Sequence, residues 1–230
     1  MGYVEIVRDS DNMKIVHVIP SLTKGGGEKV AADLASHAGR AGHQVTIIAA
    51  YPEDPLLLQD ELSEQIVIRF VSKNVPSKFG KYFHLVSWIW KNGSWLACQD
   101  IIHCHLTYSS VFGTVVKFWR RTLRKSRPLV LETYHSVGMN IPRWQRWTHT
   151  RLASRKDGVI LMARDPYWSR FLSRHSNLES KTIPNGISFS NSDEVSLDVR
   201  KAYRKTLGIP VECQFVIGTV GMLRSDRQPW

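Results

Sequence analysis

A glycine-rich loop between two β-branched runs is the feature that most constrains how this 230-residue chain can fold. The first run, at 14–19, leads into Pro20, Ser21 and then three consecutive glycines. Apolar residues recur at helical spacing until Gly42, and a second β-branched run follows at 45–49. Strand, loop, helix and strand in this order predict a β-α-β unit, in which the two strands are parallel and the crossover is right-handed.

The same alternation continues through most of the chain. Further strands are predicted at 66–71, 101–104, 128–133, 158–162 and 181–184, and further helices at 79–90, 111–123, 143–155 and 166–175. A chain that alternates strands with helices in this way forms a parallel sheet with helices on both of its faces. The predicted fold class is therefore α/β, a Rossmann-like, doubly wound parallel sheet.

The composition of the chain changes after Asn185 and Gly186. A polar stretch without strand character follows, and then an apolar strand at 214–220 with only ten residues after it. Ten residues are too few for the crossover and the partner strand that a parallel strand needs. The predicted organisation is a Rossmann-like domain at 13–187, a linker with a helix at 188–213, and at 214–230 only the first strand of a second Rossmann-like domain.

The charge balance of the chain is strongly basic. Thirty-one Lys and Arg against twenty Asp and Glu give a net charge of +11, which attracts phosphate groups on nucleic acids, membranes or small substrates. No apolar run reaches the roughly 18 residues of a membrane span, and acidic residues near the start disfavour a secretory signal. The three scattered cysteines fit a reducing compartment. We therefore expect a cytoplasmic protein.

Basic residues are interleaved with tryptophan around Trp119, Trp144 and Trp147. This pattern suits the surface of an anionic bilayer, where each basic residue contributes about 1 kcal/mol to binding. The predicted membrane-facing residues are Lys117, Arg120, Arg121, Arg124, Arg143 and Arg146. A solvated basic face is the alternative. Nucleic acid is not expected as a partner, because the sequence has no helix-turn-helix, zinc-finger or RNA-platform signature.

Three loops that follow predicted strands are candidates for ligand binding, because open α/β sheets bind ligands where their strands end. They lie at 21–28, 105–110 and 134–140. In the first, glycines allow close approach to the backbone and a helix N-terminus attracts anions, so a diphosphate fits there. A turn needed only for tight folding is the alternative. Val30 replaces the third glycine of G-x-G-x-x-G, and G-x-x-x-x-G-K-[ST] does not occur, which disfavours NAD, FAD and ATPase functions.

Histidines mark the ends of two predicted strands. His103 and His105 alternate around Cys104, so the two imidazoles share one face of the strand and the thiol points to the other. That arrangement is poor for three ligands on one zinc ion, and no metal site is predicted. His105 and His135 each lie at a strand end, where an imidazole can bond to a sugar hydroxyl or a phosphate, or transfer a proton. Loop histidines bonded only to backbone are the alternative.

Five segments of the chain carry a family resemblance: KIVHVIPSLTKGGGEKVAADLASHAGRAGHQVTIIA, DIIHCHLTYSSVFG, LVLETYHSV, TIPNGIS and FVIGTVGMLRSDRQ. In this order they resemble the family 4 glycosyltransferases, retaining enzymes of the GT-B fold, from Met13 to Trp230. The first is similar to the family's opening β-α-β unit with its GG-x-E loop. The second and third are similar to strands that end at a histidine. The fourth resembles the segment before the linker, and the fifth the start of the second domain.

The resemblance implies roles for individual residues. Gly26 and Gly27 would lie near the donor diphosphate, and Glu28 near the acceptor or the donor. His105 and His135 would face the acceptor and the transferred sugar, and with Glu28 they form the predicted catalytic set. Such roles are chemically coherent, since retaining transfer depends on a stabilised leaving diphosphate and a positioned acceptor hydroxyl more than on a strong base.

Further implied roles concern the junction with the second domain. Asn185 and Gly186 would shape this junction, and Arg224 and Arg227 would bind phosphate. The sequence departs from the family in this region, where Gln228 stands at the position of a glycine. The family's E-x7-E motif does not follow before Trp230. The resemblance therefore implies the acceptor-side half of the enzyme with a truncated donor-binding domain.

The predicted function is transfer of a sugar from a nucleotide-sugar donor to a lipid-linked, polysaccharide or lipopolysaccharide-type acceptor. This chain would be the acceptor-side half, inactive alone. The nucleotide sugar is a co-substrate, and no metal or other cofactor is expected. An anionic membrane surface is the expected further partner, at the inner face of the cell membrane, while the oligomeric state is left open. The alternative function is that of a non-catalytic membrane- or glycan-binding remnant of such an enzyme.

Overall fold

A computed structural model describes residues 12–23, 25–52, 62–74, 77, 80–122, 128–135, 143–186, 196–210 and 213. The chain divides into two compact units, Met1–Asn185 and Gly186–Trp230. The first unit contains the sheet. In the second, helix α7 (Leu197–Thr206) lies within the range predicted to be a linker with a helix. The strand predicted at 214–220 is outside the described residues. No helix within the described ranges has the length and apolar character needed to cross a bilayer.

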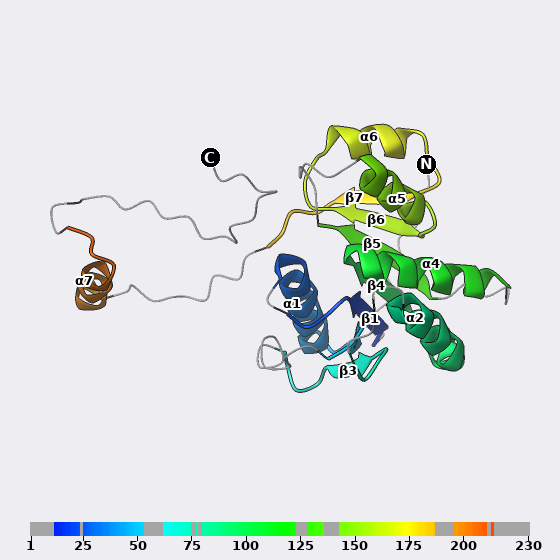
Figure 1. Ribbon diagram of the computed structural model, residues 1–230, viewed down its shortest axis with the longest axis horizontal. Helices are drawn as coiled ribbons and strands as arrows, with labels where there is room; N and C mark the ends of the chain where they lie inside the picture. Colours follow the sequence, from blue (N-terminus) through cyan, green and yellow to red (C-terminus); the bar gives the residue numbers. More distant parts are fainter. Residues whose placement is uncertain are drawn as a thin grey trace. The chain divides into compact units, whose positions relative to one another are not determined.

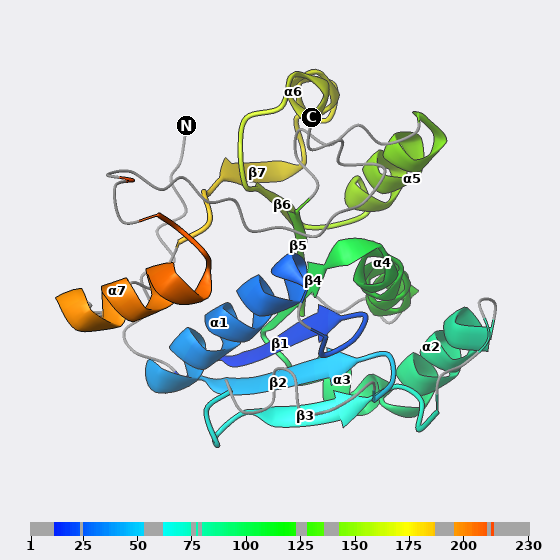
Figure 2. The same ribbon diagram turned by 60° about the vertical axis from the view of Figure 1, so that its left-hand side comes forward.

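Seven strands of the first unit form one sheet in the order β3-β2-β1-β4-β5-β6-β7 (Figures 1 and 2). Their bounds are β1 (Lys14–Ile19), β2 (Gln44–Ala49), β3 (Val67–Phe70), β4 (Ile101–His105), β5 (Leu129–Tyr134), β6 (Gly158–Leu161) and β7 (Glu179–Thr182). Every neighbouring pair is parallel. The order of the strands reverses between β1 and β4, so ligands are expected where these two strands end. The predicted doubly wound parallel sheet is confirmed.

Helices cover both faces of this sheet. The helices of the first unit are α1 (Gly26–Arg40), α2 (Gly80–Lys91), α3 (Gly93–Ala97), α4 (Leu106–Thr122), α5 (Arg143–Ala153) and α6 (Pro166–Ser173). On one face, Phe112 of α4 and Leu85 of α2 pack with Val16 and Val18 of β1. On the other face, α1 packs with Ile19 of β1 and with β2. Because side chains alternate along a strand, His17 lies on the same face of β1 as Ile19.

The sheet and helix α4 meet at a sharper turn than the sequence predicted. A loop was expected at 105–110, but α4 begins at Leu106, directly after β4 ends at His105. Leu106 makes this turn in one residue by adopting a φ of +68°, the left-handed conformation that a leucine rarely takes. Such a residue costs on the order of 1–3 kcal/mol and persists only where its surroundings hold it. The turn places the first residues of α4 at the switch point instead of a loop.

A buried ion pair joins α4, β5 and the segment after α5. The ammonium group of Lys156 donates to the Ser110 carbonyl oxygen at 2.8 Å and to Thr114 Oγ1 at 2.7 Å. It also lies 3.5 Å from the Glu132 carboxylate, which accepts from Ser110 Oγ at 2.8 Å. The side chains of Lys156 and Glu132 are 0% and 3% exposed. Two full charges inside the fold are therefore matched to each other and to hydrogen-bonding partners, as burial requires.

Candidate functional site

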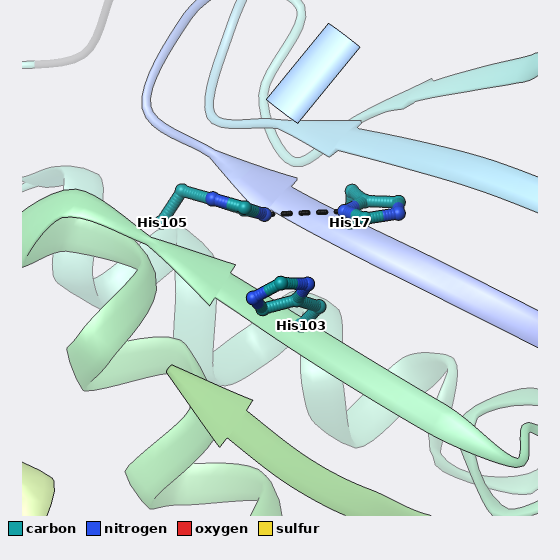
Figure 3. A group of neighbouring side chains, drawn as sticks. All are labelled: His17, His103 and His105. Carbon is teal, nitrogen blue, oxygen red and sulfur yellow. Dashed lines mark hydrogen bonds between the residues drawn. The ribbon is translucent and has the colours of Figure 1, made fainter. Parts of the chain in front are cut away.

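Four histidines lie where the first, fourth and fifth strands approach their carboxyl ends. His17 belongs to β1, and His103 and His105 belong to β4, where His103 is the direct cross-strand partner of His17. His135 follows β5 by one residue. Figure 3 shows His105 reaching from β4 toward His17, with His103 beside them on the same face of the sheet. The topology thus gathers imidazoles from three separate parts of the sequence at the switch point.

Hydrogen bonds connect three of these rings in a line. His17 Nδ1 lies 3.1 Å from His105 Nε2, and His105 Nδ1 lies 3.1 Å from His135 Nε2. His103 is bonded elsewhere, with its Nε2 2.7 Å from Thr133 Oγ1. The two histidines predicted from strand ends are therefore in direct contact, and His105 is bonded to other imidazoles and not to backbone.

Burial keeps these imidazoles neutral. His105 is fully buried and His17 is 3% exposed, while His135 is half-buried. Burial lowers the pKa of His17 and of His135 to about 4. Burial, and secondarily the neighbouring imidazoles, also holds the pKa of His103 and of His105 well below the usual value. At neutral pH each ring therefore carries one N–H donor and one lone pair.

Ring nitrogens of His17, His103 and His105 lie within 4.8 Å of one another, a spacing that could also hold a metal ion. The prediction of no metal site considered β4 alone and did not include His17, which comes from the neighbouring strand. Neutral imidazoles are the form that binds metals. A nitrogen that binds a metal uses its lone pair for that bond, so a metal on either nitrogen of the hydrogen bond between His17 and His105 would replace this hydrogen bond.

The glycine loop adjoins the start of α4. A Cβ at Gly27 would lie 3.0–3.3 Å from the side chain of Leu106, so glycine there allows the loop and the strained turn to approach closely. At Gly26, the first residue of α1, an added Cβ would meet no other described residue within 4 Å beyond its chain neighbours and the backbone of α1. The space beside the Gly26 Cα is therefore not filled by a side chain of another described residue. An anionic ligand could approach the N–H groups of α1 there.

Glu28 lies in the first turn of α1, and its carboxylate folds back over Gly25. A Cβ on Gly25 would overlap this carboxylate, which is the far end of a flexible side chain and can turn away. A negative charge is stabilised at the positive end of a helix dipole. The carboxylate therefore occupies part of the region expected to bind a diphosphate, and an incoming diphosphate would have to turn it aside.

The structure describes only two of the four residues predicted at the domain junction. Asn185 ends the first unit and Gly186 begins the second, and both are exposed. Arg224 and Arg227 are outside the described residues. The junction role of Asn185 and Gly186 and the phosphate-binding role of Arg224 and Arg227 stay predictions.

Two residues of the predicted membrane-facing set lie in an ion-pair cluster instead of on a free basic face. Lys117 donates to the Asp157 carboxylate at 2.8 Å, and Arg120 donates to it at 3.1 Å. Arg120 also donates to the Pro128 carbonyl oxygen at 2.7 Å, and its side chain is only 12% exposed. The sequence pattern could not reveal this arrangement, because Asp157 comes from beyond the following strand and helix.

The other members of the membrane-facing set divide into two groups. Arg121 and Arg143 are exposed. Arg124 and the side chain of Arg146 lie outside the described part of the chain. The basic face that the sequence predicts is thus represented in the structure by Arg121 and Arg143.

The most informative residue that the sequence did not single out is His17. It lies in the middle of the first strand, where an alternating apolar pattern points His17 to the opposite face from Val16 and Val18. That period-two position is a signal that could have marked it. Its partner could not be read, because His105 becomes its neighbour only when β4 pairs with β1.

Known proteins share this architecture. The family model of Glycosyltransferase Family 4 matches residues 24–190. No curated protein matches the chain. Among solved structures, HepE of Anabaena in complex with UDP and glucose is 18% identical, with a TM-score of 0.61 over 85% of this chain and 50% of its own. A glycosyltransferase of Rickettsia africae is 17% identical, with a TM-score of 0.57 over 88% of this chain and 51% of its own.

A third solved structure agrees with these two. Sucrose-phosphate synthase of Thermosynechococcus elongatus is 17% identical, with a TM-score of 0.59 over 87% of this chain and 53% of its own. The chain therefore spans about half the length of the structures that it matches. At these identities the likeness shows the fold, and the family match, which covers well over half of the chain, shows the relationship. This chain belongs to Glycosyltransferase Family 4.

Proposed function

We propose that this chain is the acceptor-side half of a retaining glycosyltransferase that uses a nucleotide-sugar donor and a lipid-linked or polysaccharide-type acceptor. The observation that carries the proposal is His135, a neutral, half-buried imidazole bonded to buried His105 where strands β4 and β5 end. Such a ring, held by a second ring, can position a sugar hydroxyl. Membership of Glycosyltransferase Family 4 supports the reaction class.

The roles of the remaining residues follow from this proposal. The N-terminus of α1 beside open Gly26 would stabilise charge on the donor diphosphate, as pre-oriented N–H groups do for a leaving group. Glu28 would move from Gly25 to a hydroxyl of the acceptor or the donor. Asn185, Gly186, Arg224 and Arg227 would complete the donor site together with a second domain. Because most donor contacts would come from that domain, this half would be inactive alone.

Binding of an acceptor-type glycan to the 230-residue chain tests the proposal for this half. We expect a polyprenyl-phosphate-linked sugar to shift the imidazole signals of His135 in nuclear magnetic resonance spectra. His135→Ala should weaken binding by about tenfold, the loss of roughly one to two hydrogen bonds at up to 1.5 kcal/mol each. His37→Ala, an exposed histidine at the far end of α1, is the matched control and should bind normally. Equal binding by both variants would remove His135 from the acceptor site.

A peripheral membrane contact is part of the proposal, and the surface of α2 supports it. Phe83, Val86 and Trp90 recur at helical spacing and are 75%, 50% and 78% exposed. Lys81 and Lys91 lie on the same helix. Exposed aromatic and basic residues on one helix suit the interface of an anionic bilayer.

Replacing the α2 aromatics should weaken vesicle binding more than replacing the exposed arginines. Burial of a large apolar side chain contributes about 1.5–3 kcal/mol, so Phe83→Ser with Trp90→Ser should lower partitioning by at least about 100-fold. Arg121→Gln with Arg143→Gln should cost about 2 kcal/mol, and only on anionic vesicles. Co-sedimentation with phosphatidylglycerol and phosphatidylcholine vesicles measures both effects. Leu34→Ser, at an exposed position of α1, is the control, and unchanged binding of the α2 variant would exclude α2 as the contact.

A further inference from the structure

Three imidazoles form a continuous hydrogen-bonded line from the interior of the sheet to the end of β5. The distances from His17 Nδ1 to His105 Nε2 and from His105 Nδ1 to His135 Nε2 are both 3.1 Å. His17 and His105 are buried, and only His135 is partly exposed. The line therefore links a ring that no ligand can reach to the ring where a ligand would bind.

The number of protons limits how this line can be arranged. A neutral imidazole has one N–H and one lone pair, and each hydrogen bond needs one of each. His105 bonds through both nitrogens, so it must donate through one and accept through the other. Since burial lowers the pKa of all three rings, the neutral forms are those present at pH 7.

Only two arrangements satisfy both hydrogen bonds. In the first, His17 donates to His105 and His105 donates to His135, so all three rings carry their proton on Nδ1. In the second, His135 donates to His105 and His105 donates to His17, so all three carry it on Nε2. The outer nitrogen of His135, Nδ1, is a donor in the first arrangement and an acceptor in the second.

We propose that this line is a tautomeric coupling device, in which buried His17 and His105 are positioning residues that decide whether His135 Nδ1 donates to or accepts from a bound sugar. The ligand at His135 rests on the proposed function, whereas the coupling is a property of the three rings. The device would tie the hydrogen-bonding preference of His135 Nδ1 to the two buried rings, because the three tautomers can change only together. In either arrangement an acceptor hydroxyl could then bind in one orientation only, as an acceptor or as a donor, which is how a pre-organised site positions its ligand.

His103 provides an internal comparison. Its ring centroid lies 4.2 Å from that of His105 and on the same face of the sheet, yet its hydrogen bond goes to Thr133. The His103 ring is closer to His105 than the rings of His17 and His135 are, but it is not hydrogen-bonded to His105. The proposal therefore predicts that His17 influences His135 and that His103 does not.

Long-range ¹H–¹⁵N correlation spectra of the histidine side chains test the proposal, because they distinguish the two neutral tautomers. In the unmodified chain without ligand, we expect His17, His105 and His135 to share one tautomer. His17→Leu should abolish the single-tautomer signal of His135, although the two residues do not touch. His17→Asn, whose amide can occupy the place of Nδ1, should restore it, and His103→Leu should leave it unchanged.

Three results would overturn the coupling. The first is a tautomer of one ring that differs from the tautomer of the other two rings in the unmodified chain. This measurement needs no variant to fold. The second is a single tautomer at His135 that persists in a folded His17→Leu variant. The third is a changed tautomer of His135 in a folded His103→Leu variant, since the hydrogen bond of His103 goes to Thr133 and not to the line. Coupled tautomers that ignore an added polyprenyl-phosphate-linked sugar would instead reject the proposed function and leave the coupling intact.

Discussion

Replacing Lys156 with methionine should lower the free energy of unfolding by about 3–5 kcal/mol, the cost of removing one partner from a buried ion pair. The Lys156 side chain is fully buried, and its ammonium group donates to two carbonyl oxygens and to Thr114. Methionine fills similar volume but leaves the Glu132 carboxylate without its counter-charge. Urea unfolding measures the loss.

A second substitution separates the charge effect from lost volume. Glu132→Gln in the Lys156→Met background removes the unpaired charge, so the double variant should be more stable than Lys156→Met alone. If the double variant is less stable by the sum of both single effects, the two side chains do not act as a pair.

The pH dependence of Lys156→Met has a definite sign. Burial raises the pKa of Glu132, and Lys156 is the largest influence that opposes this rise. Without Lys156 the folded pKa lies further above the unfolded value of about 4.3. A raised folded pKa contributes stability below the unfolded pKa that is lost as pH rises, so the difference from the unmodified chain should narrow toward pH 4 and widen toward pH 8. A difference independent of pH would contradict this assignment.

Phe112→Ala should also cost about 3–5 kcal/mol, because it removes a fully buried aromatic ring from the centre of the sheet's α4-covered face. The Phe112 ring lies 6.0 Å from that of Trp88, so the substitution opens a cavity between α4 and α2. Phe118→Ala is the matched control on the same helix, since Phe118 is 68% exposed and should change stability by no more than about 0.5 kcal/mol. Denaturant unfolding of both variants is the measurement, and similar losses would contradict the assigned core.

Local sequence patterns predict most of the fold. Each strand of the sheet lies within a few residues of its predicted range, because buried parallel strands appear as short β-branched runs between helical stripes. The turn after β4 could not be predicted, since no pattern shows that Leu106 adopts a left-handed conformation normally left to glycine. Helix α3, which begins at Gly93 directly after α2, is likewise absent from the predicted elements. Such connections depend on tertiary contacts that local sequence patterns do not reveal.

In the candidate site, too, the sequence predicts some residues and does not predict their partners. The ends of strands β4 and β5 pointed to His105 and His135, and the structure places these rings in hydrogen-bonding contact. His17 was missed because its neighbour belongs to a strand far along the chain. The helical spacing of Lys117 and Arg120 on α4 predicts membrane-facing residues, but no sequence pattern shows that both side chains pair with Asp157. Local periodicity thus locates side chains on an element, while their partners depend on how elements pair.

The most direct test of the central claim is sugar transfer from a panel of nucleotide sugars to lipid-linked acceptors. The assay compares this chain with the same chain extended by the second domain of another family 4 glycosyltransferase. We expect transfer only by the extended form, and a loss of at least about 100-fold on His135→Ala, the usual contribution of a positioned acid–base or polar group. Glycan binding without transfer in either form would contradict the enzymatic account and favour a non-catalytic binding protein.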